Sequence, residues 1–123
     1  MGSFRVEVRI APVENPEHGI RIQAALVDTG AERSCFPAAL LDAAGVKRNR
    51  RQGFRQATGE VFERWTGRAV VEVGGRDTVD DVVFGEPGDL VLLGARSLEG
   101  LNVHVDPVSK RLVDAGPMPM AAA

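Results

Sequence analysis

The sequence predicts a mostly-β domain, either a barrel or a sandwich, and three observations support this class. Apolar residues occupy every second position from Phe4 to Ile10 and again from Ile20 to Leu26, a period typical of strands with one buried face. Turn sequences rich in glycine, proline, asparagine and aspartate recur between the short apolar runs. Helical signals are confined to two short segments, so we expect about eight strands, no internal repeat and no linker.

The length and composition are those of one globular domain. The chain has 123 residues, of which 44% are hydrophobic and 26% charged, and its net charge is −2. A domain of this size buries about two-thirds of its unfolded surface and needs no cross-link. The single cysteine, Cys35, excludes an internal disulfide framework. Without a long apolar run or a signal-peptide pattern, we expect a cytoplasmic protein that does not bind membranes.

The first half of the chain predicts two hairpins and a helix. The first two strands flank residues 12–19, a loop with two prolines, an asparagine and a glycine, so we expect them to pair. Pro37 and Gly45 bracket a segment rich in alanine and leucine, which is the pattern of a short helix. Residues 54–63 then predict a long hairpin that turns at Thr58-Gly59.

The second half predicts shorter strands and a second short helix. We expect strands at residues 69–73, 82–84 and 90–93, a helix at 95–99, and a last hairpin formed by 102–105 and 111–113. The strand at 90–93 is apolar on both faces and should lie in the centre of the domain. Residues 116–123 hold two prolines and three terminal alanines, so we expect a domain at 1–115 and a flexible tail at 116–123.

The clearest chemical signature is Asp28-Thr29-Gly30-Ala31, at the end of the second strand. The strand delivers a carboxylate to its end, and Gly30 lets the backbone turn without crowding it. An ordinary turn leaving a strand has the same composition, so the tetrapeptide alone fits either a turn or a site. Further along, Leu92-Leu93-Gly94 ends the central strand with a glycine that permits close backbone approach.

Together these segments resemble the retropepsin-type aspartic proteases, the group of retroviral proteases and small bacterial relatives. Residues 26–31 match the family's two apolar residues followed by Asp-Thr-Gly-Ala, residues 52–66 resemble its flap hairpin, and residues 92–94 match its later apolar-apolar-Gly. The stretch at 101–113 resembles the small bacterial members in particular. The resemblance extends over residues 4–114 and implies a closed retropepsin-like acid-protease barrel with a flap hairpin and one or two short helices.

The resemblance also implies a site. Its catalytic residues are Asp28, Thr29 and Gly30, and its substrate-binding residues are Ala31, Glu32 and the flap residues Ala57, Thr58 and Gly59. The chain departs from the family in three ways: Ala95 rather than the arginine frequent in retroviral members follows Gly94, Arg33 replaces an acidic residue after the motif, and the flap tyrosine of pepsin-like relatives is absent because the chain has no tyrosine. The first two concern details of the substrate pocket and none changes the catalytic aspartate.

Hydrolysis of a peptide bond by aspartates requires two carboxylates that share one proton. One activates a water molecule and the other polarises the scissile carbonyl. Because the chain holds one Asp-Thr-Gly, the resemblance implies a homodimer in which Asp28 of each copy meets at a two-fold axis. It implies an aspartic endopeptidase that acts on extended polypeptides, with water as the nucleophile and no metal or organic cofactor.

Several alternatives remain open on the sequence alone. The same fold would serve as a non-catalytic module that binds a peptide or a partner. The basic residues at 47–55 could contact nucleic acid, although such a run is usually a solvated surface and the net charge argues against it.

Other constellations have common structural explanations. Cys35 with His18 or His104 could form a thiol–imidazole pair, but a lone cysteine is more often buried filler, and we expect His104 to face outward. Asp77, Asp80 and Asp81 could bind a cation, but such clusters are usually solvated. Three aromatic residues either line a groove under the flap or close the core: Phe54, Phe62 and Trp65.

Overall fold

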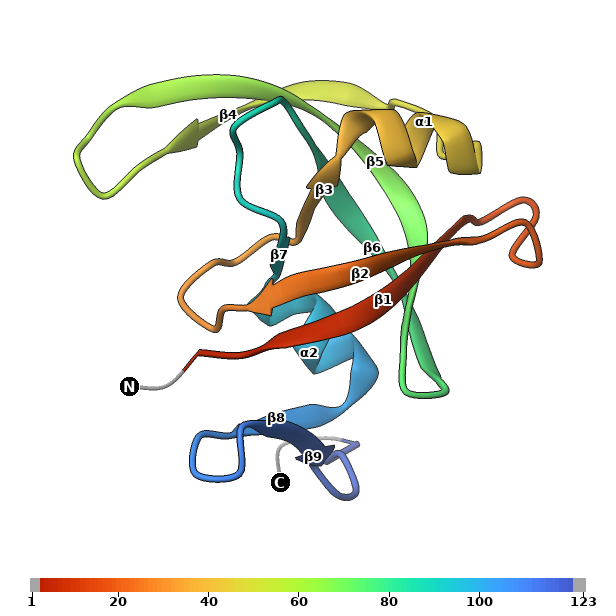
Figure 1. The fold of residues 1–123 in the computed structure, drawn as a ribbon, viewed down its shortest axis with the longest axis vertical. Coiled ribbons are helices and arrows are strands. Elements are labelled where there is room, and N and C mark those ends of the chain that lie inside the picture. Colours follow the sequence, from red (N-terminus) through yellow and green to blue (C-terminus); the bar gives the residue numbers. More distant parts are fainter. Residues whose placement is uncertain (1–2, 121–123) are drawn as a thin grey trace.

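The computed structural model describes residues 3–120, which form one large curled sheet, two short helices and a small separate sheet (Figure 1). The large sheet contains seven strands in the order β1-β2-β7-β3-β6-β5-β4. The element bounds are β1 (Arg5–Pro12), β2 (Ile20–Val27), β3 (Cys35–Pro37), α1 (Ala38–Ala44), β4 (Arg50–Arg55), β5 (Val61–Val73), β6 (Arg76–Gly85), β7 (Leu92–Leu93), α2 (Ala95–Leu101), β8 (Val103–Asp106) and β9 (Arg111–Asp114). The prediction of a mostly-β chain with two short helices is confirmed.

The closed barrel that we expected is not formed as a regular barrel. β1 pairs with β5 from Arg9 to Pro12, so the sheet curls back on itself. However, β7 has only two residues and meets β3 through a single residue pair, Cys35 with Leu92. One residue pair is too short a ladder to close a barrel, whereas the strands of the long hairpins pair over several residues. The result is a curled sheet from which the β4–β5 hairpin projects (Figure 1).

The predicted hairpins are present, with longer strands than the alternation suggested. β1 and β2 pair antiparallel from Arg5 opposite Leu26 to Ile10 opposite Ile20. Residues 61–73 form one continuous strand, β5, where we expected a hairpin arm and a separate strand at 69–73. β6 likewise begins at Arg76 rather than at residue 82, because it pairs with β5 directly after the Gly74-Gly75 turn.

The core lies inside the curl of the large sheet. Its inward side chains come from alternate positions of the long strands, as the period of two residues predicts. The largest apolar side chains that are almost fully buried are Val8, Ile10, Phe36, Leu41, Val71, Val82, Phe84 and Leu93. Leu93 belongs to the central strand β7, where burial was expected, although the strand spans only two residues instead of four.

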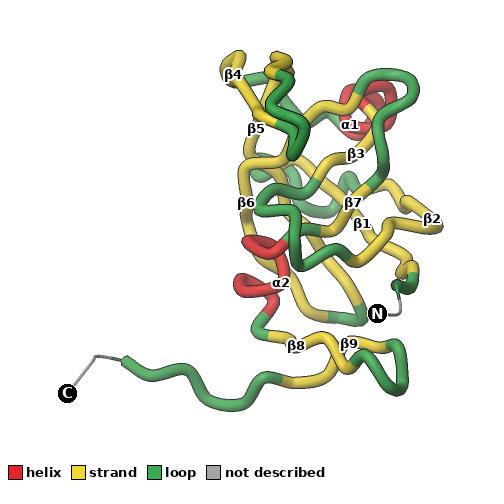
Figure 2. The backbone as a smooth tube through the Cα atoms, turned by 90° about the vertical axis from the view of Figure 1, so that its left-hand side faces the viewer, coloured by secondary structure: helices red, strands yellow, loops and turns green. Residues whose placement is uncertain are grey.

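Both helices are short; α1 ends at Gly45 as predicted, whereas α2 runs to Leu101, beyond the predicted end at residue 99. α1 follows Pro37 and ends at Gly45, whose φ of 91° is left-handed and therefore suits glycine. α2 follows Gly94 and ends at Asn102, which also adopts a left-handed conformation. α2 packs on β6 and leads into the β8–β9 sheet, so these elements lie together at one end of the molecule (Figure 2).

The end of the described chain has no regular structure. Residues 115–120 follow β9 without a helix or strand, and Met118 and Met120 are exposed. The rest of the predicted tail, residues 121–123, lies outside the described residues, as do residues 1–2 of the predicted domain. Within residues 3–120, no helix has the length and apolar character to cross a membrane.

Candidate active site

Asp28 stands directly after β2, where the strand is held beside β7. Leu26 and Val27 pair in parallel with Leu92 and Leu93, and the Asp28 amide donates to the Leu93 carbonyl over 3.0 Å. Asp28 therefore continues the ladder by one residue before the chain turns. The backbone of Asp28 is thus anchored by the pairing of β2 with β7.

The turn itself holds one oxygen of the Asp28 carboxylate. The Gly30 amide donates to Asp28 Oδ1 over 2.9 Å, and the Ala31 amide donates to the Asp28 carbonyl over 3.2 Å. A Cβ on Gly30 would stand 3.2 Å from Oδ1, so glycine keeps the carboxylate uncrowded. Oδ2 makes no hydrogen bond within the described part of the chain, and Thr29 and Gly30 are exposed. The Gly30 amide therefore fixes Oδ1, whereas Oδ2 remains available to another hydrogen-bond partner.

The segment before α2 packs against the loop that follows Asp28. The amides of Ala95 and Arg96 donate to the carbonyls of Ala31 and Glu32, over 2.8 and 3.0 Å. These bonds satisfy amides at the start of α2 that have no partner inside the helix. Both parts of the predicted pattern, Asp-Thr-Gly-Ala and Leu-Leu-Gly, therefore belong to one hydrogen-bonded unit.

The predicted flap is the β4–β5 hairpin. Its tip closes through the Gln56 amide, which donates to the Glu60 carbonyl over 2.9 Å, and Gly59 has a left-handed φ of 92°. All residues from 56 to 60 are exposed. In Figure 1 the tip and the 28–34 loop extend on the same side of the molecule. The structure thus brings Asp28, Thr29, Gly30, Ala31 and Glu32 together in one loop and places Ala57, Thr58 and Gly59 in a second.

The aromatic residues of the flap divide between a surface stack and the core. Phe54 and Phe62 stack across the hairpin with ring centroids 5.9 Å apart, and the Arg64 guanidinium lies over the Phe62 ring. Trp65 instead packs against the core, beneath Arg51. The core explanation is therefore confirmed for Trp65, whereas Phe54 and Phe62 stack on each other in the hairpin and a role in lining a groove stays a prediction.

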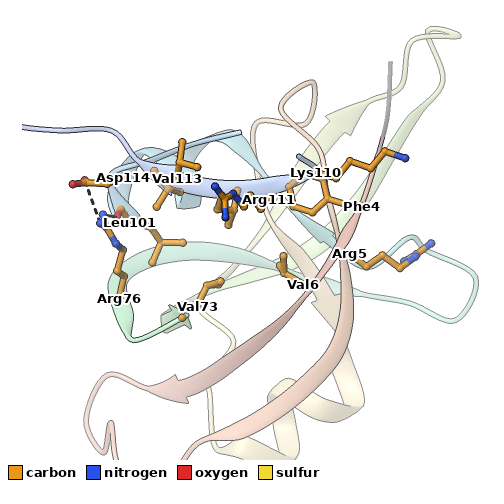
Figure 3. A pocket seen from close by; sticks show the side chains of 13 residues that line it. Phe4, Arg5, Val6, Val73, Arg76, Leu101, Lys110, Arg111, Val113 and Asp114 are labelled. Carbon is orange, nitrogen blue, oxygen red and sulfur yellow. Dashed lines mark hydrogen bonds and ion pairs between the residues drawn. The ribbon is translucent and has the colours of Figure 1, made fainter. Parts of the chain in front are cut away.

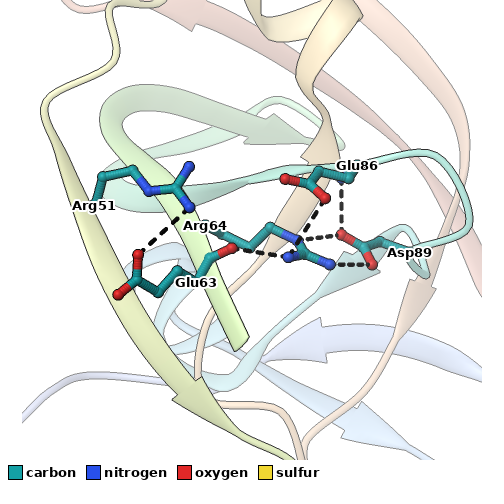
Figure 4. A network of polar contacts seen from close by, with 5 residues as sticks. All are labelled: Arg51, Glu63, Arg64, Glu86 and Asp89. Carbon is teal, nitrogen blue, oxygen red and sulfur yellow. Dashed lines mark hydrogen bonds and ion pairs between the residues drawn. The ribbon is translucent and has the colours of Figure 1, made fainter. Parts of the chain in front are cut away.

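An ion-pair network joins the flap strand to the loop before β7 (Figure 4). Arg64 on β5 binds both oxygens of Asp89, with Nε–Oδ2 at 2.7 Å and Nη2–Oδ1 at 3.0 Å, and its Nη1 lies 3.6 Å from Glu86. The hydrogen bonds from Arg64 lower the pKa of Asp89, and the Glu86 amide bond to Oδ2 acts in the same direction. This network fixes the base of the flap and was not foreseen from the sequence.

The thiol–imidazole alternative finds no support in the structure. Burial raises the pKa of Cys35 to about 11, and the neighbouring Asp89 adds to the rise. No hydrogen bond joins Cys35 to either histidine within residues 3–120, and His104 is exposed on β8, as expected. A protonated thiol without a base partner is a poor nucleophile.

The candidates for binding a cation or nucleic acid are also explained otherwise. In the described residues, no three His, Cys, Asp or Glu side chains gather as metal ligands. Asp80 is buried on β6, whereas Asp77 is exposed. The basic run is a solvated surface, and three of its members face acidic partners: Lys47 with Glu14, Arg48 with Asp42, and Arg51 with Glu63.

Two grooves of about 340 Å³ lie near the small sheet. One is bounded by β1, the β5–β6 turn and β9 (Figure 3). The other is bounded by Thr29, α2, β8 and Met118. Asp28 lines neither of them. The carboxylate is therefore presented at the surface of the single chain, beside rather than inside these hollows.

Comparison with known proteins identifies the family. No curated protein matches the chain. A family model described as "gag-polyprotein putative aspartyl protease" matches residues 19–100, which include both the Asp28 turn and the Leu92-Leu93-Gly94 segment. The match extends over more than half of the chain and includes both β2 and β7. The chain therefore belongs to the gag-polyprotein family of aspartyl proteases, the retropepsin-like group that its sequence motifs resemble.

Proposed function

We propose that the protein is an aspartic endopeptidase whose active site forms between two copies, with Asp28 from each. The observation that supports this most directly is the state of the Asp28 carboxylate: Oδ1 is held by the Gly30 amide, and Oδ2 has no hydrogen bond within the described residues. A single chain offers one such carboxylate in an Asp-Thr-Gly turn. Two are needed to share a proton, so a second copy completes the site.

The two carboxylates would divide the chemistry between them. The ionised Asp28 takes a proton from a water molecule as the water attacks the scissile carbonyl carbon, and the protonated Asp28 of the other copy donates a hydrogen bond to the carbonyl oxygen. Thr29 and Gly30 would set the geometry of the turn around the dyad. The proton that the base has taken is then available to the leaving amine, so no metal or organic cofactor is required.

The substrate would be a polypeptide in extended form. The exposed flap tip at Ala57, Thr58 and Gly59 offers backbone groups to an extended strand, which is how strand addition gives affinity. Ala31 and Glu32 follow the catalytic turn on the other side of the proposed cleft. Together, the two loops would hold the substrate backbone over Asp28 while side chains enter neighbouring subsites.

The test is cleavage of a diverse peptide library between pH about 4 and 7. The wild-type chain should cleave and Asp28→Asn should not, because the amide cannot share a proton. Asp77→Asn is the matched control, since Asp77 is an exposed aspartate on β6 outside the proposed site. Equal cleavage by wild type and Asp28→Asn would exclude Asp28 as the catalytic group. No cleavage by any variant would favour the alternative, a non-catalytic peptide- or partner-binding module on this fold.

A further inference from the structure

Three buried polar side chains form a line beneath the loop that carries Asp28. Ser34 ends that loop, Ser97 lies on α2, and Asp80 lies on β6; both serines are fully buried and Asp80 is 7% exposed. Ser97 Oγ lies 2.8 Å from Asp80 Oδ2 and 2.6 Å from Ser34 Oγ. We call Ser34, Ser97 and Asp80 the buried hydroxyl chain.

The hydrogen bonds of the buried hydroxyl chain all run in one direction. An ionised carboxylate only accepts, so Ser97 donates its proton to Asp80. Ser97 then has no proton left for Ser34, and Ser34 must donate to Ser97 Oγ. The Gly94 amide donates in turn to Ser34 Oγ over 2.9 Å. Aligned hydrogen bonds that end on a charge strengthen one another in a low-dielectric interior.

The far end of the buried hydroxyl chain is the peptide group between Leu93 and Gly94. Its N–H donates to Ser34, and its carbonyl accepts the Asp28 amide over 3.0 Å. Because a peptide group is planar and rigid, fixing the direction of the N–H also fixes the direction of the C=O. The orientation of this one peptide group therefore determines where the backbone of Asp28 is held.

We propose that Asp80, Ser97 and Ser34 are positioning residues for Asp28, acting through the Leu93–Gly94 peptide group. The proposal rests on the proposed function of Asp28. The buried hydroxyl chain sets the tilt of that peptide group, and hence the place that Asp28 takes opposite its counterpart in the dyad. Its members are buried and do not face the cleft. Loss of a member should therefore change the rate of the chemical step and leave substrate binding unchanged.

The test compares kcat and KM for variants of the buried hydroxyl chain. We expect Ser97→Ala and Asp80→Ala each to lower kcat about tenfold, since each leaves a buried donor or acceptor unpaired. KM should stay within about twofold of wild type, because substrate contacts are unchanged. Asp80→Asn should retain most of kcat, because its amide oxygen can still accept from Ser97. Ser34→Ala removes the second hydroxyl of the buried hydroxyl chain and tests its hydrogen bonds with Ser97 and the Gly94 amide.

A core variant separates positioning from general destabilisation. Val71→Ala removes two methyl groups from a fully buried position on β5, away from Asp28, and should lower the melting temperature without lowering kcat. If the variants of the buried hydroxyl chain keep wild-type kcat, or if Val71→Ala lowers kcat equally at matched stability, the positioning role is wrong. The positioning role is also wrong if Asp80→Asn is as impaired as Asp80→Ala.

A second readout does not depend on catalysis. The amide protons of Asp28 and Gly94 should exchange with solvent faster in Ser97→Ala than in Val71→Ala at matched stability. The reason is that the Leu93–Gly94 peptide group, which contains the Gly94 amide and accepts the Asp28 amide, is no longer held in place. Unchanged exchange would overturn the proposal even if activity fell. A wild-type chain that cleaves no peptide would contradict the proposed function, and the exchange measurement would still decide whether the buried hydroxyl chain holds the Asp28 backbone.

Discussion

Gly94 lies in backbone contact with Arg33, the residue at the far side of the loop that carries Asp28. A Cβ placed on Gly94 would stand 2.6 Å from both the carbonyl carbon and the carbonyl oxygen of Arg33, and 2.9 Å from the Ala31 carbonyl oxygen. Real Cβ atoms do not approach backbone so closely, so only glycine fits. The loop that carries Asp28 and the start of α2 therefore pack backbone against backbone, with no side chain between them at Gly94.

Gly94→Ala should destabilise the protein and impair the site together. The added methyl group must push the 28–34 loop away from α2, at a cost of about 1–3 kcal/mol for overpacking. Urea unfolding measures this cost, and peptide cleavage measures the effect on the site. Gly53→Ala is the matched control, because nothing lies within 4 Å of a Cβ at Gly53. Gly94→Ala with wild-type stability would contradict this prediction, because it would show that the 28–34 loop can move away from α2 without a cost in free energy.

The ion pair of Arg64 and Asp89 should make part of the stability depend on pH. The pKa of Asp89 is lowered in the folded chain, so its contribution is present above the unfolded pKa and is lost as pH falls through the folded value. The free-energy difference between wild type and Asp89→Asn should thus be largest near pH 6, about 1 kcal/mol for a partly exposed pair, and shrink toward pH 3. Urea unfolding at both pH values measures it.

The exposed Asp77 provides the control for this dependence on pH. It forms no ion pair within residues 3–120, so Asp77→Asn should unfold like wild type at both pH values. A difference for Asp89→Asn that is as large at pH 3 as at pH 6 would mean that the ionised carboxylate is not what stabilises the flap base.

Cys35 should be a slow target for alkylation and dispensable for cleavage. With its pKa raised to about 11 by burial, the thiolate fraction at pH 8 falls roughly two orders of magnitude below that of a free cysteine. Iodoacetamide labelling followed by mass spectrometry measures the rate against the unfolded chain in urea. Cys35→Ala should cleave peptides at the wild-type rate. Loss of cleavage in this variant, with stability retained, would revive a thiol mechanism.

The sequence was most informative where local chemistry determines structure. The alternation at Phe4–Ile10 and the residues flanking α1 predicted β1 and that helix to within a few residues, because burial and helix ends act locally. The extent of β5 and β6 was underestimated, since Arg68 and Asp81 are held in the sheet by their register and not by their own preference for strand. The absence of a regular closed barrel follows from the single residue pair that joins β7 to β3, which no local pattern encodes.

The residues of the candidate site also fall into two groups: those that a short motif predicts and those that only the fold brings together. Asp28 and Gly30 lie two residues apart, so their hydrogen bond follows from a short motif. Ser34, Ser97 and Asp80 come together only through the fold, and the two serines are 63 positions apart. Arg64 and Asp89 are 25 positions apart and also meet only through the fold. An isolated serine or arginine carries no signal of such a partner, so these residues could not be predicted.

A mixing experiment tests whether two copies share one site. The Asp28→Asn chain should fold like wild type and exchange freely into dimers, where the mixed site holds one carboxylate and cannot share a proton. With random pairing, an equal amount of the variant should lower the activity of each wild-type chain by about half, because half of its partners are inactive. Asp77→Asn, mixed in the same ratio, should cause no loss. If Asp28→Asn also leaves the wild-type rate unchanged while dimers exchange, each copy works alone and the shared dyad is wrong.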